Sequence, residues 1–180
     1  MSGFHNLISD YLPCVQRKKG STISVMAEAK IFFKLDVDGD GYPPVAVESV
    51  WARSGEKAGE YIIDNIPFFT KEATDGDVVA ASQDDKGNLW FHEVLRPSRN
   101  SLIRVIFFVT DQLESVREHL IALGCATEYF GTYGLLSVSV PAQIDLSSIE
   151  QYLDEHRESG AIDYEGAILW DQSRPQDPVV

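Results

Sequence analysis

The sequence predicts an α+β protein, with a small β-barrel-like N-terminal part followed by a ferredoxin-like βαββαβ part. Two observations support this prediction. Five short apolar segments with turn residues between them occupy residues 30–100, a spacing typical of a small barrel or a strongly curled sheet. Residues 101–170 then alternate strand-like runs with two helix patterns in the order β-α-β-β-α-β, which is the ferredoxin-like order.

The five strand candidates of the first part are rich in β-branched and aromatic residues. They are residues 30–35, 45–52, 60–64, 77–81 and 88–94. Between the third and fourth candidates, Pro67 fixes the backbone ahead of the adjacent Phe68 and Phe69. We expect these two rings to plug the end of the barrel or the seam between the two parts, whereas an exposed pair would mark a binding site.

The second part begins with a β-branched and aromatic run at residues 102–109. It contains Phe107 and Phe108, of which one must face outward from the sheet, and we expect both to serve packing. Asp111 and Glu114 are spaced as a capping box and predict the start of a helix that ends at Gly124. The apolar stripe of this helix is Leu113, Val116, Leu120 and Ile121.

A hairpin, a helix and a last strand complete the second part. The strands of the hairpin are expected at residues 125–130 and 135–140, on either side of a Gly-Thr-Tyr-Gly turn. Asp145 predicts the N-cap of the second helix, Gly160 its end, and residues 161–169 the last strand. The apolar stripe of this helix is Leu146, Ile149, Tyr152 and Leu153.

Both ends of the chain differ from the body. Residues 1–29 are predicted to be an accessory or weakly ordered segment, because a short apolar helix face is followed by Pro13 and a basic, Gly/Ser-containing linker. Translation could even start at Met26. Residues 171–180 contain two prolines and are predicted to form a frayed tail.

The charge of the chain limits its partners. The formal net charge is −13, although residues 1–30 carry +2. So negative a surface repels nucleic-acid backbones and favours a basic protein partner, while simple solubility is an equally good explanation. No apolar run is long enough to span a bilayer, and the basic cluster at residues 17–19 follows the apolar stretch, which is the wrong order for a signal peptide. We therefore predict a cytoplasmic protein without membrane contact, in which Cys14 and Cys125 are free thiols.

One acidic turn resembles a calcium loop without completing it. Asp36, Asp38 and Asp40 match the first, third and fifth positions, and Gly41 matches the sixth. The twelfth position, which needs a carboxylate, is Val47. The better interpretation is a solvated turn between two strands, and we predict no metal site.

No catalytic set is visible either. The four histidines are scattered, and the sequence has no Gly-x-Ser-x-Gly elbow, no phosphate-binding loop and no dinucleotide fingerprint. We therefore predict no catalytic residue and no cofactor, although a buried acid pair depends on three-dimensional placement that a sequence does not give.

Several short motifs in order carry a resemblance to a known family. They are residues 40–45, Glu48, residues 51–52, residues 64–68, residues 76–79 and residues 89–91. Across about residues 30–170 the chain resembles the bacterial domain family of unknown function number 4265. The resemblance implies no established activity. Family members carry Ser-Gly-His-Ser before a strand that contains Arg, whereas this chain has Ser98-Arg99-Asn100-Ser101 before Arg104, so any chemical role of the family histidine is in doubt here.

Two hypotheses for function follow. The first is a non-catalytic acidic binding protein, most plausibly a cytoplasmic immunity protein that neutralises a bacterial toxin by protein–protein interaction. Its partner-binding residues would be Asp36, Asp38, Asp40, Tyr42, Asp84 and Asp85. The alternative is a small-ligand-binding protein or enzyme that uses a cleft between the two parts. The cleft would be lined by Asn65, Ser98, Asn100, Ser101 and Arg104. The sequence leaves the oligomeric state undetermined.

Overall fold

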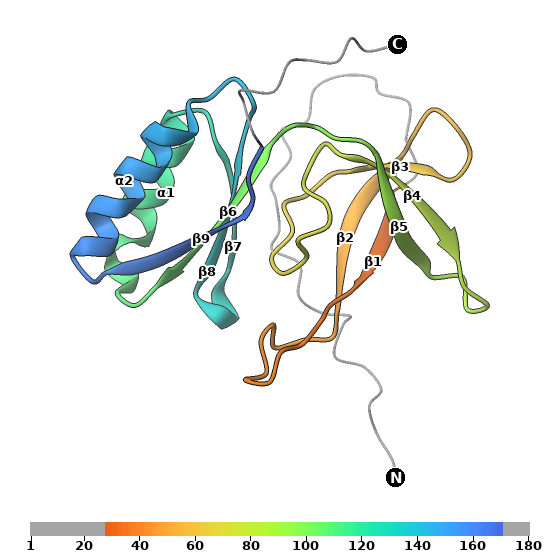
Figure 1. Ribbon diagram of the computed structural model, residues 1–180, viewed down its shortest axis with the longest axis horizontal. Coiled ribbons are helices and arrows are strands. Elements are labelled where there is room, and N and C mark those ends of the chain that lie inside the picture. Colours follow the sequence, from red (N-terminus) through yellow and green to blue (C-terminus); the bar gives the residue numbers. More distant parts are fainter. Residues whose placement is uncertain (1–27, 171–180) are drawn as a thin grey trace.

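The computed structural model describes residues 28–170, which form two layers of β structure side by side, with two helices on the outer side of one of them (Figure 1). These residues hold nine strands in two sheets and two α-helices, as expected for a mixed α+β protein. The helix face predicted near the N-terminus, Cys14, Met26 and the predicted tail lie outside the described residues.

Five strands close into a ring. They are β1 (Glu28–Lys34), β2 (Val47–Ser54), β3 (Glu60–Ile63), β4 (Val78–Gln83) and β5 (Leu89–Arg96). Neighbours along the chain pair antiparallel, and a short parallel pairing of β1 with β5 closes the ring. The bounds differ from those of the expected strands by at most two residues at each end.

Side-chain alternation explains why these segments close around an apolar interior. On β1, Ile31 and Phe33 are fully buried inside the ring, whereas Phe32 between them packs outside against Trp90, with ring centroids 5.6 Å apart. Ile63 of β3 and Val79 of β4 complete the same interior. The ring thereby has a core of its own.

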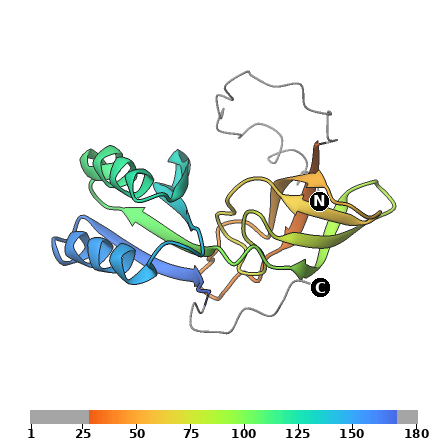
Figure 2. The same ribbon diagram turned by 90° about the horizontal axis from the view of Figure 1, so that it is seen from above.

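The second sheet has the strand order β7-β8-β6-β9 and is antiparallel throughout. Its strands are β6 (Ser101–Phe107), β7 (Ala126–Phe130), β8 (Leu135–Val140) and β9 (Ile162–Ile168). Helices α1 (Leu113–Ala122) and α2 (Leu146–Glu158) cover the face that points away from the ring (Figure 2). A second core lies between this sheet and the two helices. The opposite face of the sheet points toward the ring and forms one side of the seam between the two sheets.

The two helices start differently. Asp145 caps α2 as predicted, because its carboxylate accepts a hydrogen bond from the backbone N–H of Ser147. The predicted cap at Asp111 is wrong: this residue lies in a short 3₁₀ turn, and Gln112 is the N-cap of α1 without a side-chain hydrogen bond. Ile121 was expected on the buried face of α1 but is 48% exposed, since α1 buries only the narrower stripe of Val116 and Leu120. No helix within residues 28–170 is long and apolar enough to cross a membrane.

Candidate functional site

The segment between β3 and β4 fills the seam between the ring and the second sheet. Its backbone is fixed by side chains from both sides. From the ring, the buried carboxylate of Glu48 on β2 accepts hydrogen bonds from the backbone N–H groups of residues 68–70, with distances of 2.6, 3.0 and 2.7 Å. From the second sheet, Glu128 accepts from the N–H of Ile66 and the Ser137 hydroxyl donates to the carbonyl of Pro67. This segment therefore joins the two sheets.

Aromatic side chains pack around the same segment. Phe68 and Phe69 contact Phe130 on β7, with ring centroids 5.2 and 6.3 Å apart. Phe69 also meets the ring of Tyr133 edge-on at 5.6 Å. The expectation that Phe68 and Phe69 plug the seam is confirmed, and the buried Phe69 becomes part of a wall.

Arg104 is the centre of the polar contacts in the seam. It lies on β6, on the face turned toward the ring, and its side chain is only 1% exposed. One guanidinium nitrogen donates to Glu165 Oε1 on β9 at 2.9 Å, and another donates to the carbonyl of Thr70. Lys71 reaches the second oxygen of Glu165 at 3.2 Å. The charge of the buried arginine is therefore balanced inside the molecule, while its Nε has no hydrogen-bond partner.

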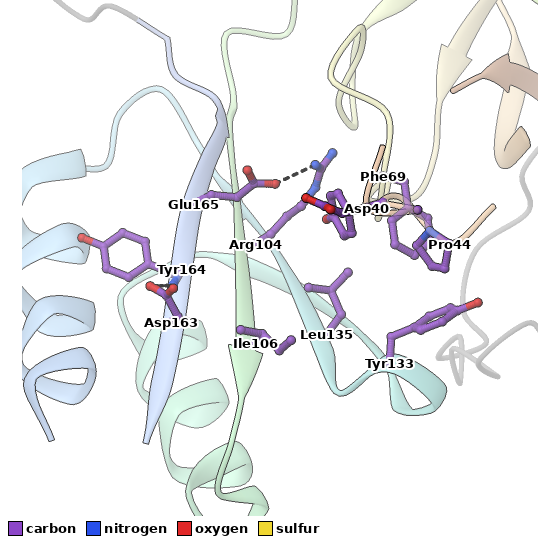
Figure 3. A pocket seen from close by; sticks show the side chains of 12 residues that line it. Asp40, Pro44, Phe69, Arg104, Ile106, Tyr133, Leu135, Asp163, Tyr164 and Glu165 are labelled. Carbon is purple, nitrogen blue, oxygen red and sulfur yellow. Dashed lines mark hydrogen bonds and ion pairs between the residues drawn. The ribbon is translucent and has the colours of Figure 1, made fainter. Parts of the chain in front are cut away.

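A cavity of about 560 Å³ opens beside Arg104 (Figure 3). The residues that line it come from the loop between β1 and β2, the β3–β4 segment, and three strands of the second sheet with the turn before β8. They are Asp40, Gly41, Tyr42, Pro44, Phe69, Arg104, Ile106, Tyr133, Leu135, Asp163, Tyr164 and Glu165. Its volume lies within the range of about 300–1,000 Å³ that ligand pockets span.

The electrostatics of the cavity combine burial with charge pairing. Burial raises the pKa of Tyr42, although the Arg104 guanidinium acts in the opposite direction. Burial also tends to raise the pKa of Glu165, but hydrogen bonds from Arg104 and Lys71 outweigh it, so this pKa is lowered and the carboxylate is charged. Within residues 28–170, no cation pairs with Asp40 or Asp163. The lining thus has three carboxylates and one guanidinium that is already neutralised.

The predicted partner-binding residues of the β1–β2 loop divide into two roles. Asp38 stabilises its own turn, because its carboxylate accepts from the backbone N–H groups of Asp40 and Tyr42, both at 2.9 Å. This is the turn between two strands that the sequence predicts. Asp36 is exposed to solvent, while Asp40 and Tyr42 are exposed and also line the cavity.

The second predicted loop, between β4 and β5, lies apart from the cavity. Asp84 accepts hydrogen bonds from the backbone N–H groups of Lys86 and Asn88 and from the Trp90 indole at 3.0 Å. The hydrogen bond from the Trp90 indole has the largest effect, and together these hydrogen bonds hold the pKa of Asp84 well below its usual range. Asp84 therefore stabilises the turn of the β4–β5 hairpin. Asp85 beside it is exposed.

Of the five predicted cleft residues, only Arg104 lines the cavity. Asn65 accepts from the N–H of Trp51 at 2.6 Å. The other three join the end of β5 to the start of β6. In this junction Ser98 N–H donates to Asp77, the Asn100 amide donates to Asp75, and Ser101 accepts from the N–H of Trp170. The polar groups of these four residues therefore form hydrogen bonds within the molecule and do not line the cavity.

Sequence reasoning missed most of the cavity. The sequence predicts Tyr133 only as part of a turn, and Ile106, Leu135 and Glu165 only as parts of strands. An alternation rule could have placed Ile106 with Arg104 on one face of β6 and could have singled out Arg104 as a charge among apolar neighbours. No sequence pattern gives the register between β6 and β9 that brings Glu165 to Arg104. Within residues 28–170, no group of three or more metal-ligating side chains is placed to hold an ion.

Comparisons with known proteins complete the description of the site. A family model described as a domain of unknown function (DUF4265) matches residues 48–164. A solved structure titled a novel crystal structure of a hypothetical protein from Neisseria gonorrhoeae is similar, with a TM-score of 0.62 and 21% sequence identity. The similarity covers 81% of this chain and 97% of that chain, so the two share a fold. No curated protein matches the chain.

Proposed function

The chain belongs to the DUF4265 family, and because that description assigns no activity, we propose from the site itself that this is a non-catalytic acidic protein that binds a basic protein partner. In its most specific form the proposal is a cytoplasmic immunity protein that neutralises a bacterial toxin by blocking it. The likeness to the gonococcal structure supports the fold alone.

The observation that carries the proposal is a group of large apolar side chains left exposed around the cavity. Tyr42 is 44% exposed, Ile106 40% and Tyr133 37%, and all three line the cavity. Phe108, two residues beyond Ile106 along the chain, is 64% exposed, so the expectation that it serves packing is wrong. We call these four residues the apolar rim. Aromatic side chains left in water next to a concave surface are typical anchors of protein–protein interfaces.

Charge indicates the kind of partner. Residues 28–170 contain 25 Asp and Glu residues against 11 Lys and Arg residues. Beside the apolar rim, the exposed carboxylates of Asp40 and Asp163 form no ion pair with a Lys or Arg of residues 28–170. Such a surface accelerates the encounter with a positively charged protein and disfavours nucleic acid, so a basic toxin domain fits it best.

The test is capture followed by protection. The full chain, immobilised, is exposed to a lysate of the source bacterium, and each captured protein is then expressed alone and together with the chain. We expect a basic protein whose expression arrests growth, and we expect co-expression of the chain to restore growth. Failure to capture a basic protein, or capture of one that the chain does not neutralise, would overturn the proposal.

The Phe108→Ala variant serves as the matched test of the surface. Since Phe108 is mostly exposed, its truncation leaves the fold intact, and we expect at least tenfold weaker capture of the same partner. Leu95→Ala is the control, because Leu95 is also a large exposed apolar side chain, at 41%, but it lies on β5 of the ring and is not part of the apolar rim. Equal capture by both variants would remove the apolar rim from the interface.

The cavity also favours a second candidate, a small-ligand-binding protein. A volume of about 560 Å³ with aromatic walls and a buried arginine suits a metabolite as well as a protein side chain. A rise in the melting temperature of the isolated chain with a single purified metabolite, abolished by Leu135→Trp filling of the cavity, would favour this candidate over the first.

The finer assignment of the fold is part of the proposal. We infer that β1 to β5 form a small barrel and that β6 to β9 with α1 and α2 form a ferredoxin-like unit. The strand order β7-β8-β6-β9 and the element order β-α-β-β-α-β support the second assignment. An experimental structure of the chain with a different strand order would contradict it.

A further inference from the structure

We infer that the cavity in the seam receives one cationic side chain, an arginine or a lysine, of the basic partner. This inference rests on the proposed function and names what its site recognises. The occupant is argued from three features of the cavity: its charge, its aromatic walls, and its position in the apolar rim.

The charge of the cavity favours a cation. Arg104 is the sole basic residue in the lining, and its guanidinium is taken up by Glu165 and by the carbonyl of Thr70. Neither Asp40 nor Asp163 forms an ion pair with a Lys or Arg of residues 28–170. Two carboxylates beside low-dielectric walls attract a positive group more strongly than they would in open solvent.

The aromatic walls of the cavity also suit a cationic side chain. Tyr42, Phe69 and Tyr133 meet edge to face, Tyr42 and Phe69 with centroids 6.4 Å apart at 76°, and Phe69 and Tyr133 at 83°. Rings held in this way present electron-rich faces in several directions, and such faces bind ammonium and guanidinium groups. The apolar stem of a lysine or arginine would pack on Leu135 and Ile106, which also line the cavity.

An anionic occupant fits the cavity less well. It would have to displace Glu165 from Arg104, and Arg104 Nε is shielded from solvent although it lacks a partner. It would also lie beside Asp40 and Asp163. Both effects oppose an anion, whereas neither opposes a cation.

The test uses two probes of the same shape. Nα-acetyl-arginine N-methylamide carries the cation, and Nα-acetyl-citrulline N-methylamide replaces it by a neutral urea. Binding to the full chain is followed by amide chemical shifts in two-dimensional NMR at physiological ionic strength. We expect saturable shifts at residues 40–42, 133–135 and 163–165 with the arginine probe, and at least tenfold weaker binding of the citrulline probe. Equal binding of both probes, or no binding of either, would overturn the inference.

A pair of matched double variants locates the site. Asp40→Asn with Asp163→Asn removes two charges from the cavity, and Glu118→Gln with Glu155→Gln removes two charges from exposed positions on α1 and α2, outside its lining. We expect the first pair to weaken binding of the arginine probe at least tenfold and the second pair to weaken it less than twofold. Equal losses in the two double variants would show a diffuse charge effect and would refute a specific site.

The same variants separate this inference from the proposed function. A toxin captured equally well by the wild type and by the Asp40→Asn, Asp163→Asn variant would overturn the inference and leave the proposed function standing. Specific binding of the arginine probe without any neutralised basic protein would overturn the proposed function and leave the cavity as a cation site.

Discussion

At the residue scale, a single charged side chain organises the seam. Arg104 is the largest fully buried side chain within residues 28–170, and it contacts the β3–β4 segment through Thr70 and β9 through Glu165. A buried guanidinium is tolerated only where hydrogen bonds and an opposite charge replace its water, and both are present here. Its contribution is therefore measurable by removing it alone.

Replacing Arg104 by Leu should lower the free energy of unfolding by about 2–3 kcal/mol. The Thr70 carbonyl loses its donor, whereas Glu165 is partly exposed and recovers water, which keeps the cost below that of a fully buried pair. Arg104→Lys should recover only part of the loss, because an ammonium group does not reproduce the guanidinium fork. Urea unfolding of the three proteins measures this, and a neutral Arg104→Leu variant would contradict it.

Glu165 predicts a pH dependence of stability. Its pKa is lowered from 4.5 in the folded state by Arg104 and Lys71, against the effect of burial. An acid with a depressed folded pKa stabilises the fold above its unfolded pKa, and this contribution is lost as the pH falls through the folded value. Glu165→Gln should therefore be less stable than wild type at neutral pH, with the difference shrinking below about pH 4.5. Thermal unfolding across this range checks it, with the exposed Glu93→Gln as control; a constant difference would be inconsistent with the assignment.

Arg99 is the non-glycine residue with a positive φ, +70°, among the described residues. Glycine reaches this conformation without the Cβ penalty that any L side chain meets there. Arg99→Gly should accordingly be more stable than Arg99→Ala by about 1 kcal/mol, since both variants lose the contact with Trp170 but only Ala keeps the strain. Calorimetric melting of the pair tests this, and an Ala variant as stable as the Gly variant would refute it.

At the element scale, the β3–β4 segment holds the two sheets together. It has little regular structure, yet Glu48 fixes three of its backbone N–H groups and Phe69 fills the space beneath it. The motif around Pro67 resembles that of the family, and the structure gives it a physical role at the seam. The contribution of this segment to stability can be measured by comparing truncation of the buried Phe69 with truncation of the exposed Phe108.

Phe69→Ala should cost about 3–4 kcal/mol of unfolding free energy, because Phe69 is 7% exposed and its removal leaves a cavity. Phe108→Ala removes the same atoms from a side chain that is 64% exposed and should cost less than about 0.5 kcal/mol. Chemical denaturation of both variants gives the comparison. Similar losses at the two positions would mean that the seam is not packed as the structure shows.

At the scale of the whole molecule, the excess of carboxylates opposes folding as well as attracting basic proteins. Ion pairs within residues 28–170 engage several of these acids, including Glu60, Glu114 and Asp154, but Lys and Arg are outnumbered 11 to 25. Like charges on a compact surface repel one another, and dissolved salt screens this repulsion. Stability should therefore depend on ionic strength.

Raising sodium chloride from low to physiological concentration should increase the melting temperature, because the Debye length falls to about 8 Å and the carboxylates repel one another less. Differential scanning calorimetry at fixed pH measures this. A parallel series with an equal osmolality of sucrose separates screening from general exclusion effects. A melting temperature that falls with salt would show that attractive surface pairs outweigh the repulsion.

The sequence by itself determined the order and type of the elements, the Asp145 cap and the burial of Phe69, because side-chain period, turn residues and capping are local properties. It placed Asp40, Tyr42 and Arg104 in two separate candidate sites, and only the tertiary structure brought them to one cavity. Residues 40, 104 and 165 meet because β9 pairs with β6 and the β3–β4 segment holds the ring against that sheet. The register of this pairing and the placement of the ring depend on how complete surfaces pack, which no local pattern encodes.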